Sequence, residues 1–267
     1  MSFGLEISRI ADSELQKYKI KYDKAASEDN TYRRKGVMYH KAQFKEDLHL
    51  YENYFFGKVN GVIVESGALD GDLFSTTYMF QKHFNWLPVH VEGGIKHYNK
   101  LIVNRPDAIN INAALCNESR VLHYLSRRAG SPVDGIIEFM EPKFVKRFHK
   151  MYSLTQQSDY LQEVQCMRFA DIAKALGLRH IDIWVLDVEG AELQVLQGTD
   201  FAELEIDVII VETVRRDFVA SETLLVKELL SRQGYTCQPF HNNEVCARRG
   251  FQPSRKPDLP TQASRKK

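Results

Sequence analysis

Short apolar runs bounded by polar residues alternate along this chain with segments whose apolar residues have helical spacing. Residues 61–65 form the first run, which ends in an acid with a glycine close behind, as is typical of a buried parallel strand. Further runs lie at 87–91, 108–114, 181–186 and 208–211, and the helical segments lie at 73–84, 96–103, 169–176, 191–196 and 221–233. This alternation predicts βαβ units with right-handed crossovers, and therefore an α/β fold with a doubly wound, mostly parallel sheet.

The C-terminal part of the chain departs from the alternation. Residues 235–240 and 244–248 predict two strands joined by a turn at 241–243, which favours a closing antiparallel hairpin at one edge of the sheet. From residue 250 no apolar pattern remains, so we expect a disordered tail over 250–267.

Two more regions lie outside the regular alternation. Apolar spacing near residues 5–10 and 44–56 predicts helices in an N-terminal extension over 1–55, which leaves 56–249 as a single domain. Within that domain, residues 117–165 contain several Gly, Pro and Asp breakers and show no regular pattern. Because this stretch is longer than a simple connection needs, we expect an irregular insertion that covers the substrate.

The charge balance gives no general reason to expect a nucleic acid or an anionic membrane as partner, because 36 Lys and Arg face 35 Asp and Glu. No apolar run approaches the roughly 20 residues needed to span a bilayer. Since the N-terminus lacks an apolar signal segment, the expected location is cytoplasmic. The dispersed cysteines predict reduced, packed thiols rather than a zinc site; they are Cys116, Cys166, Cys237 and Cys246.

A loop with two glycines, Glu65-Ser66-Gly67-Ala68-Leu69-Asp70-Gly71, follows the first predicted strand and is expected to open a helix. Gly67 and Gly71 give backbone N–H groups room to approach a ligand. The G-x-G-x-x-G of dinucleotide-binding sites is absent, and Glu65 and Asp70 are poor neighbours for a diphosphate. These acids favour a cationic ligand, such as the amino and sulfonium groups of S-adenosylmethionine. A tight turn without a ligand is the alternative.

Two polar residues end the next predicted strands. Glu92 lies about 25 residues past the glycine turn, where a carboxylate can accept hydrogen bonds from both ribose hydroxyls of a cofactor. Asn112, which precedes Ala113, has a side-chain amide that can meet an adenine edge. The alternatives are a solvated acid at a strand end and an asparagine that forms a turn.

Five short motifs in one order along the chain look like those of the FkbM-type methyltransferases. They are VESGALDG at 64–71, VEG at 91–93, NAA at 112–114, LDVEGAE at 186–192 and IVE at 210–212. The DVEGAE block is the most specific, and the similarity covers residues 43–215. QFKED at 43–47 and STT at 75–77 further resemble a eukaryotic branch related to the Star protein. The chain has Glu65 where the family often has Asp, and Gly93 where it often has Pro.

The resemblance implies a Rossmann-like, class I methyltransferase fold over 56–249 and S-adenosylmethionine as the methyl donor. It also implies an acceptor with a hydroxyl group, on a small molecule or a glycan. The residues expected at the cofactor are Glu65, Gly67, Ala68, Asp70, Gly71, Glu92, Asn112, Ala113 and Asp187.

Asp187, Glu189 and Glu212 follow the fourth and fifth predicted strands, at the edge where a doubly wound sheet binds its ligands. Methyl transfer to an alcohol needs a carboxylate base or a metal that acidifies the hydroxyl, so these acids are the predicted catalytic residues. If they converge, Mg²⁺ is the expected ion, with Asp187 and Glu212 as ligands; if only Asp187 points inward, it is the base. The alternative for Glu189 and Glu192 is a place in the first turn of the following helix, where carboxylates interact favourably with the helix dipole.

Other interpretations remain open. One is a non-catalytic interaction protein that keeps the methyltransferase fold, whereas the missing G-x-G-x-x-G disfavours an NAD-dependent dehydrogenase. The scattered His90, His97, His123 and His149 predict packed or solvated side chains rather than a metal site. The aromatic and basic stretch 144–150 favours a solvated helix face over contact with an anionic acceptor. Nothing in the sequence identifies the acceptor or the oligomeric state.

Overall fold

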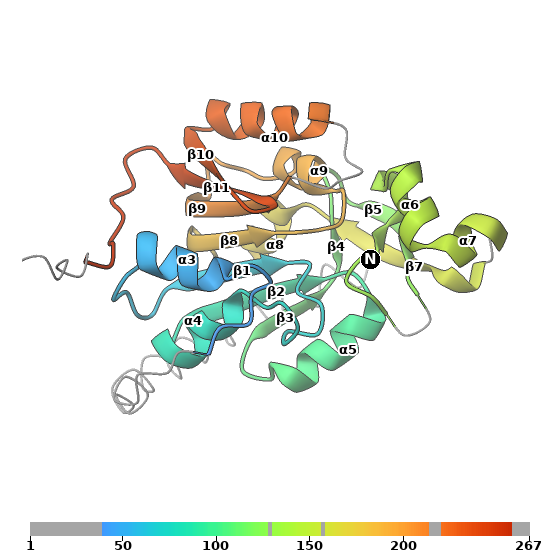
Figure 1. The fold of residues 1–267 in the computed structure, drawn as a ribbon, viewed down its shortest axis with the longest axis horizontal. Helices are drawn as coiled ribbons and strands as arrows, with labels where there is room; N and C mark the ends of the chain where they lie inside the picture. Colours follow the sequence, from blue (N-terminus) through green and yellow to red (C-terminus); the bar gives the residue numbers. More distant parts are fainter. Residues whose placement is uncertain (1–38, 128–129, 156–157, 214–219, 258–267) are drawn as a thin grey trace, which may run out of the picture.

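A seven-stranded sheet forms the centre of the molecule (Figure 1), whose computed structural model describes residues 39–127, 130–155, 158–213 and 220–257. The strand order is β10-β11-β9-β8-β1-β2-β3, with bounds β1 (Val62–Ser66), β2 (Leu87–Glu92), β3 (Ile109–Asn112), β8 (His180–Leu186), β9 (Glu205–Glu212), β10 (Tyr235–Phe240) and β11 (Asn243–Arg248). Strands β3 to β9 in this order pair in parallel, whereas β11 is antiparallel to both β9 and β10. The predicted doubly wound sheet with a closing antiparallel hairpin is therefore confirmed.

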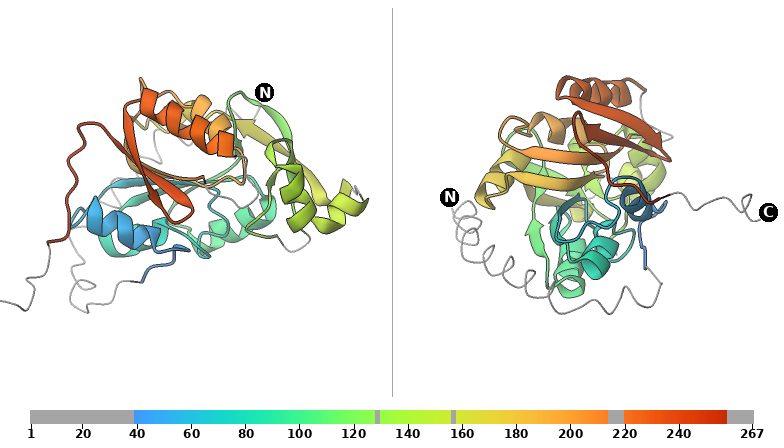
Figure 2. Two further views of the ribbon diagram at one scale, coloured as in Figure 1. Left: turned by 45° about the horizontal axis from the view of Figure 1, so that its top comes forward. Right: turned by 90° about the vertical axis from the view of Figure 1, so that its left-hand side faces the viewer.

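Helices cover both faces of this sheet (Figures 1 and 2). They are α3 (Glu46–Asn53), α4 (Thr77–Phe84), α5 (Ile95–Asn104), α8 (Phe169–Ala175), α9 (Glu192–Gln197) and α10 (Ala220–Arg232). Successive side chains of a strand point to opposite faces, so Ile63 shares a core cluster with Leu50 of α3, whereas Val64 shares one with Phe169 of α8. Both faces of β1 are therefore buried, which explains its continuous apolar run.

Helix α4 begins later than its apolar spacing predicts, at Thr77 rather than at residue 73. Asp70 Oδ1 accepts hydrogen bonds from two backbone N–H groups just after it, at 3.0 and 2.8 Å, which forms a turn where the first helical turn was expected. The loop at 65–71 thus leads into a turn and not directly into a helix.

The insertion over 117–165 forms part of a second sheet and is not irregular. This sheet has the order β4-β7-β5-β6, with bounds β4 (Ala114–Leu115), β5 (Arg120–Leu125), β6 (Gly135–Ile136) and β7 (Leu161–Met167). Helices α6 (Pro142–Phe148) and α7 (Lys150–Thr155) lie beyond the ends of β8 and β9 (Figure 1). Strands β5 and β7 are exposed at several positions and lack a continuous apolar run, so the pattern typical of buried strands misses them.

The cysteines are paired, which corrects the expectation of reduced thiols. Cys116 and Cys166 form one disulfide, and Cys237 and Cys246 form another. Cys237 and Cys246 are direct neighbours across β10 and β11, whereas Cys116 follows β4, which pairs with β7 at Cys166. Because both pairs depend on strand register, the spacing of the cysteines along the chain does not indicate them.

Residues 250–257 lie along the end of α3, in contrast to the disordered tail expected from residue 250. The Ser254 N–H donates to the Tyr54 carbonyl oxygen at 2.9 Å, for example. The remainder of the expected tail, 258–267, and the predicted helix near 5–10 lie outside the described residues. Within the described part of the chain, no helix combines the length and the hydropathy needed to cross a membrane.

Candidate cofactor and active site

A cavity of about 620 Å³ opens at the carboxyl ends of β1, β2, β8 and β9, between the seven-stranded sheet and the insertion. The predicted site residues that line it are Glu65, Gly67, Ala68, Glu92, Ala113, Asp187, Glu189 and Glu212. Asp70, Gly71 and Asn112 are not among the lining residues. In a doubly wound sheet, ligands bind at this edge, where the strand order reverses between β1 and β8.

Gly67 brings the loop after β1 into direct contact with the segment after β8. Its φ is +83°, and a Cβ added there would lie 1.8 Å from the Asp187 carbonyl oxygen. The Asp187 N–H donates to the Ser66 carbonyl oxygen at 3.1 Å, and the Gly67 N–H donates to the Val91 carbonyl oxygen at 2.9 Å. A glycine is therefore required here by both the backbone conformation and the close approach.

Gly71 and Asp70 face away from the cavity and hold the loop from behind. A Cβ added at Gly71 would lie 2.5 Å from the Leu101 side chain, and the Gly71 carbonyl oxygen accepts a hydrogen bond from Arg105 Nη1 at 2.8 Å. The Asp70 carboxylate accepts hydrogen bonds within its own turn. The Asp70 carbonyl oxygen accepts a hydrogen bond from Asn104 Nδ2 at 2.8 Å. The structure thus gives both residues contacts within the protein at the places where ligand contacts were expected.

Glu65 is buried beside the cavity, and both of its carboxylate oxygens accept hydrogen bonds. Oε1 accepts from the Thr76 N–H at 2.6 Å, and Oε2 accepts from the hydroxyls of Ser75 at 3.0 Å and Thr77 at 2.9 Å. Burial raises the pKa of Glu65, although the Arg105 guanidinium and these hydrogen bonds lower it. The carboxylate therefore fixes Ser75 and Thr76 on the cavity wall.

Arg105 is a buried residue of this network that the sequence pattern does not indicate. It is 1 % exposed, and its Nη1 also donates to Ser75 Oγ at 3.0 Å, so it holds Gly71 and Ser75 together. An arginine at the end of an amphipathic helix predicts a solvated side chain, and only the packing of α5 against the loop shows otherwise.

Glu92 is buried at the end of β2 with three hydrogen-bond donors around its carboxylate. Oε2 accepts from the Leu69 N–H at 2.9 Å, and Oε1 accepts from the Gly94 N–H at 2.7 Å and the Tyr124 hydroxyl at 3.2 Å. Burial raises the pKa of Glu92 to about 6, against the lowering effect of the hydrogen bonds and of His97. The carboxylate is thus fixed in place and titrates near neutral pH.

Tyr124, which reaches Glu92 from β5, explains the glycine where the family often has proline. A Cβ added at Gly93 would lie 3.0 Å from the Tyr124 ring, and one added at Gly94 would lie 2.9 Å from it. The two glycines therefore make room for the ring, whose hydroxyl also lies 3.1 Å from the Asp134 carbonyl oxygen. The sequence gives no signal for Tyr124, because its partner Glu92 is far away along the chain.

Asn112 lies behind the cavity rather than in it. Its Nδ2 donates to the Glu92 carbonyl oxygen at 2.8 Å and to the Gly93 carbonyl oxygen at 3.3 Å. The side chain thus joins the end of β3 to the end of β2. Its neighbour Ala113 is the residue that lines the cavity.

Asp187, Glu189 and Glu212 converge at the cavity, where one carboxylate oxygen of each lies within 4.8 Å of the other two. Glu189 has a φ of +58° and precedes α9, so it is not in the first helical turn as the alternative interpretation supposed. Glu192 does begin α9, and its carboxylate accepts hydrogen bonds from the Val188 N–H at 3.0 Å and the Gly190 N–H at 3.1 Å. Glu192 therefore shapes the turn that presents Glu189.

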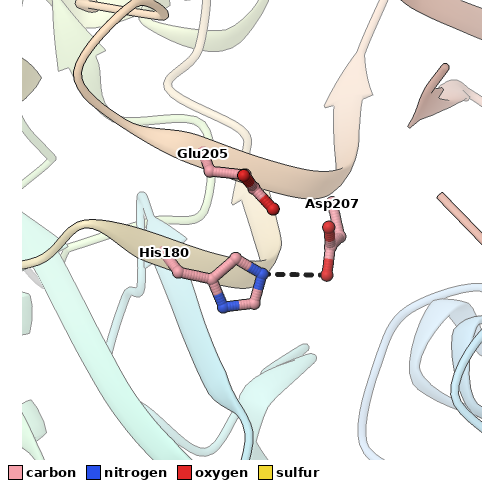
Figure 3. A group of neighbouring side chains, drawn as sticks. All are labelled: His180, Glu205 and Asp207. Atoms are coloured by element: carbon pink, nitrogen blue, oxygen red, sulfur yellow. Dashed lines mark hydrogen bonds and ion pairs between the residues drawn. The ribbon is translucent and has the colours of Figure 1, made fainter. Parts of the chain in front are cut away.

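A second group of three side chains with metal-ligand atoms lies at the amino ends of β8 and β9 (Figure 3). His180 Nε2 and Asp207 Oδ2 are 2.9 Å apart, and Arg248 Nη2 donates to Glu205 at 2.7 Å and to Asp207 at 3.0 Å. Burial raises the pKa of Asp207, but the hydrogen bonds from His180 and Arg248 lower it overall. Because a guanidinium already neutralises these acids, the group is a network of ion pairs.

A family model described as the methyltransferase FkbM domain matches residues 65–237. The chain belongs to this family. The FkbM match runs from Glu65 through the insertion to β10, so it includes the cofactor loop, Glu92 and the three converging acids. A comparison with curated proteins gives no match.

Solved methyltransferase structures are similar to this FkbM-family chain at low identity. The TehB-like SAM-dependent methyltransferase from Corynebacterium glutamicum is 10 % identical, with 87 % of this chain and 97 % of that chain covered and a TM-score of 0.37. The precorrin-6y C5,15-methyltransferase from Geobacter metallireducens is 10 % identical, with 71 % and 79 % covered and a TM-score of 0.34. Because these TM-scores are low, the strand order of the chain itself remains the evidence for its fold class.

Proposed function

We propose that this chain is an S-adenosylmethionine-dependent O-methyltransferase acting on a hydroxyl group of a small molecule or glycan. The observation that supports this most is the convergence of Asp187, Glu189 and Glu212 within 4.8 Å, on a cavity that Gly67 and Glu92 also line. Carboxylates at this place meet two needs of the reaction, because they offset the positive charge of the donor and can take the proton of the acceptor hydroxyl.

Each part of the cavity has a proposed role in this reaction. The donor supplies a methyl group on a positively charged sulfur. Glu92 accepts hydrogen bonds from the ribose hydroxyls of the donor. Asp187 takes the proton that the acceptor hydroxyl loses. Asp70 and Gly71 lie behind the cavity and hold the loop that contacts the donor. Asn112 holds the strand end that contacts it.

The converging carboxylates also fit Mg²⁺, a hard cation that prefers oxygen ligands. In this metal-dependent form of the reaction, Asp187 would be a ligand of the ion instead of the base, together with Glu212 and with Glu189 beside them. An ion held there would lower the pKa of the acceptor hydroxyl.

Isothermal titration calorimetry with S-adenosylmethionine and with S-adenosylhomocysteine tests the proposal. We expect both ligands to bind with micromolar affinity, and an absence of heat for both at millimolar concentration contradicts the proposed function. Tight binding without turnover of any acceptor would support the alternative, a non-catalytic protein that keeps the fold. The presence of the acids at 65, 92, 187 and 212 on one cavity argues against that alternative.

Binding of S-adenosylmethionine is expected to weaken as the pH falls through about 6. The ribose hydroxyls need an ionised Glu92 as acceptor, and the pKa of Glu92 is raised to about 6 by burial. Tyr124→Phe removes a hydrogen bond that favours the charged carboxylate, so the midpoint should move to higher pH. Calorimetry over a pH series that brackets this value measures both midpoints.

Glu92→Gln is the control for this prediction, because His97 faces the same carboxylate. Burial lowers the pKa of His97, but Asp134 and Glu92 raise it overall, so His97 is a second titratable group whose effect on binding must be separated from that of Glu92. The Gln variant should bind weakly and without the transition. If the transition persists in Glu92→Gln, or if wild-type affinity does not change with pH, Glu92 is not the titrating acceptor.

The two disulfides bear on the location of the protein. Disulfides form and persist in oxidising compartments and are rare in the cytosol. The pairs Cys116–Cys166 and Cys237–Cys246 therefore favour an oxidising compartment over the cytoplasmic location expected above. Free thiols can be counted in the denatured protein before reduction. Finding none would support this proposal.

A further inference from the structure

One wall of the cavity joins the closing hairpin to α3. Asn243, which pairs with Glu212 across β11 and β9, donates its side-chain N–H to Glu46 Oε1 at 3.1 Å. Phe44 extends this wall and stacks on the ring of His241, with 5.1 Å between the ring centroids. Because Glu212 neighbours Asn243, this wall stands directly beside the reaction centre.

The insertion forms the opposite wall. Gly135 of β6 approaches the turn after β8 so closely that an added Cβ would lie 2.9 Å from the Cβ of Glu189. Helix α6 continues this wall, and Phe144, Arg147 and Phe148 are its cavity-lining residues. The reaction-centre carboxylates therefore lie between the hairpin wall and the insertion wall, and we expect the acceptor to enter between the same walls.

Helix α6 presents one face to this space. Phe144, Arg147 and Phe148 are three and four residues apart, which places them on the same side of a helix. The ring centroids of Phe144 and Phe148 are 4.7 Å apart, and the guanidinium carbon of Arg147 lies 4.8 Å from the centroid of the Phe148 ring. Stacking on an aromatic ring orients the flat guanidinium group. Lys143, Lys146 and Lys150 of the same segment do not line the cavity.

Arg147 is the single Lys or Arg among the described residues that line the cavity. The acids that line it are Glu46, Glu65, Glu92, Asp134, Asp187, Glu189 and Glu212. Such an excess of carboxylates suits a cationic donor, whereas Arg147 adds positive charge and N–H donors on the acceptor side. A positive, oriented guanidinium beside apolar rings is a site for an anionic group attached to an apolar body.

We propose that the acceptor is a hydroxylated carboxylic acid whose carboxylate binds Arg147 and whose apolar part lies against Phe148 and Phe44. The inference rests on the proposed methyltransferase function and specifies its substrate class. The guanidinium offers paired N–H groups that match the two oxygens of a carboxylate. A doubly charged phosphate is disfavoured, because the surrounding carboxylates repel it more strongly.

Pairs of small molecules that differ only in this charge test the proposal. The probes are 4-hydroxybenzoate and 4-hydroxycinnamate, each with its neutral methyl ester, titrated by calorimetry into the protein saturated with S-adenosylhomocysteine. We expect each acid to bind at least about tenfold more tightly than its ester, which corresponds to about 1.4 kcal/mol. Equal affinities for acid and ester, or no binding by either, would overturn the inference.

Three variants separate a role for Arg147 from a general effect of charge. Arg147→Met should remove the preference for the acid and leave the affinity for the ester unchanged, and Arg147→Lys should restore part of the preference. Lys146→Met removes the same charge from the neighbouring position, which does not line the cavity, and should behave like wild type. If Arg147→Met keeps the preference for the acid, Arg147 is not the carboxylate site.

The affinity for S-adenosylhomocysteine, measured first in every variant, distinguishes this failure from failure of the proposed function. When the wild-type protein binds that ligand but does not prefer the acids, only the substrate class is wrong. When it binds neither S-adenosylmethionine nor S-adenosylhomocysteine, the methyltransferase function itself is wrong.

Discussion

Replacing Gly67 by alanine is expected to abolish binding of S-adenosylmethionine. The new Cβ would lie 1.8 Å from the Asp187 carbonyl oxygen, so the loop after β1 and the segment after β8 must separate. Overpacking of this kind, together with a side chain at a φ of +83°, costs about 3 kcal/mol or more. A loss of that size in binding free energy corresponds to roughly a 100-fold weaker affinity or more. Calorimetry with S-adenosylmethionine measures it.

Gly57→Ala is the matched control. Gly57 has nearly the same backbone conformation, with a φ of +81°, but a Cβ added there meets nothing within 4 Å. This variant should lose about 1 kcal/mol of stability and keep its affinity for the cofactor. If Gly67→Ala binds as well as Gly57→Ala does, the contact between the two segments is not needed for the cofactor site.

Asp187→Asn is expected to lower the rate of methyl transfer about 1000-fold, because an amide cannot take the proton of the acceptor hydroxyl. The amide keeps the shape of the side chain, and the Asp187 backbone contacts with Ser66 and Gly67 do not depend on the carboxylate. Affinity for S-adenosylhomocysteine, which lacks the positive sulfur that the carboxylate offsets, should therefore stay close to that of wild type. Steady-state kinetics and calorimetry on the same preparation separate the two effects.

Glu205→Gln serves as the comparison, since Glu205 belongs to the other group of three metal-ligand side chains, at the opposite edge of the sheet. Its carboxylate pairs with Arg248 and lies outside the cofactor cavity, so turnover should be unaffected. A parallel loss of turnover and cofactor affinity in Asp187→Asn would show that Asp187 maintains the structure of the site.

The sheet could be predicted because a strand that is buried on both faces has a run of apolar residues in the sequence. Strand β1 is covered on both faces, so its first three residues are apolar, and Gly67 follows it where no other residue fits. The insertion could not be predicted in the same way. Strands β5 and β7 have exposed positions, and β4 and β6 contain only two residues each.

The candidate site was only partly predictable for a related reason: a sequence shows that an acid is present but not where its carboxylate points. Glu65 and Asp70 were expected at the ligand because of their charge, yet both bind neighbouring backbone N–H groups. Tyr124 and Arg105 were missed because their contacts join residues about 30 positions apart. The residues of the DVEGAE block lie within one turn, where Glu192 accepts hydrogen bonds from two backbone N–H groups, so their proximity could be predicted from the sequence.

The disulfide between Cys116 and Cys166 closes a segment of 50 residues into a covalent ring whose two ends meet at one point. The chain therefore enters and leaves this module, residues 117–165, at one place. A module joined in this way can change in length or sequence during evolution without altering the register of β8 and β9. Acceptor preference and donor binding would then diversify separately within the family. Tyr124 and Gly135 limit this independence, since Tyr124 hydrogen-bonds to Glu92 and Gly135 packs against Glu189.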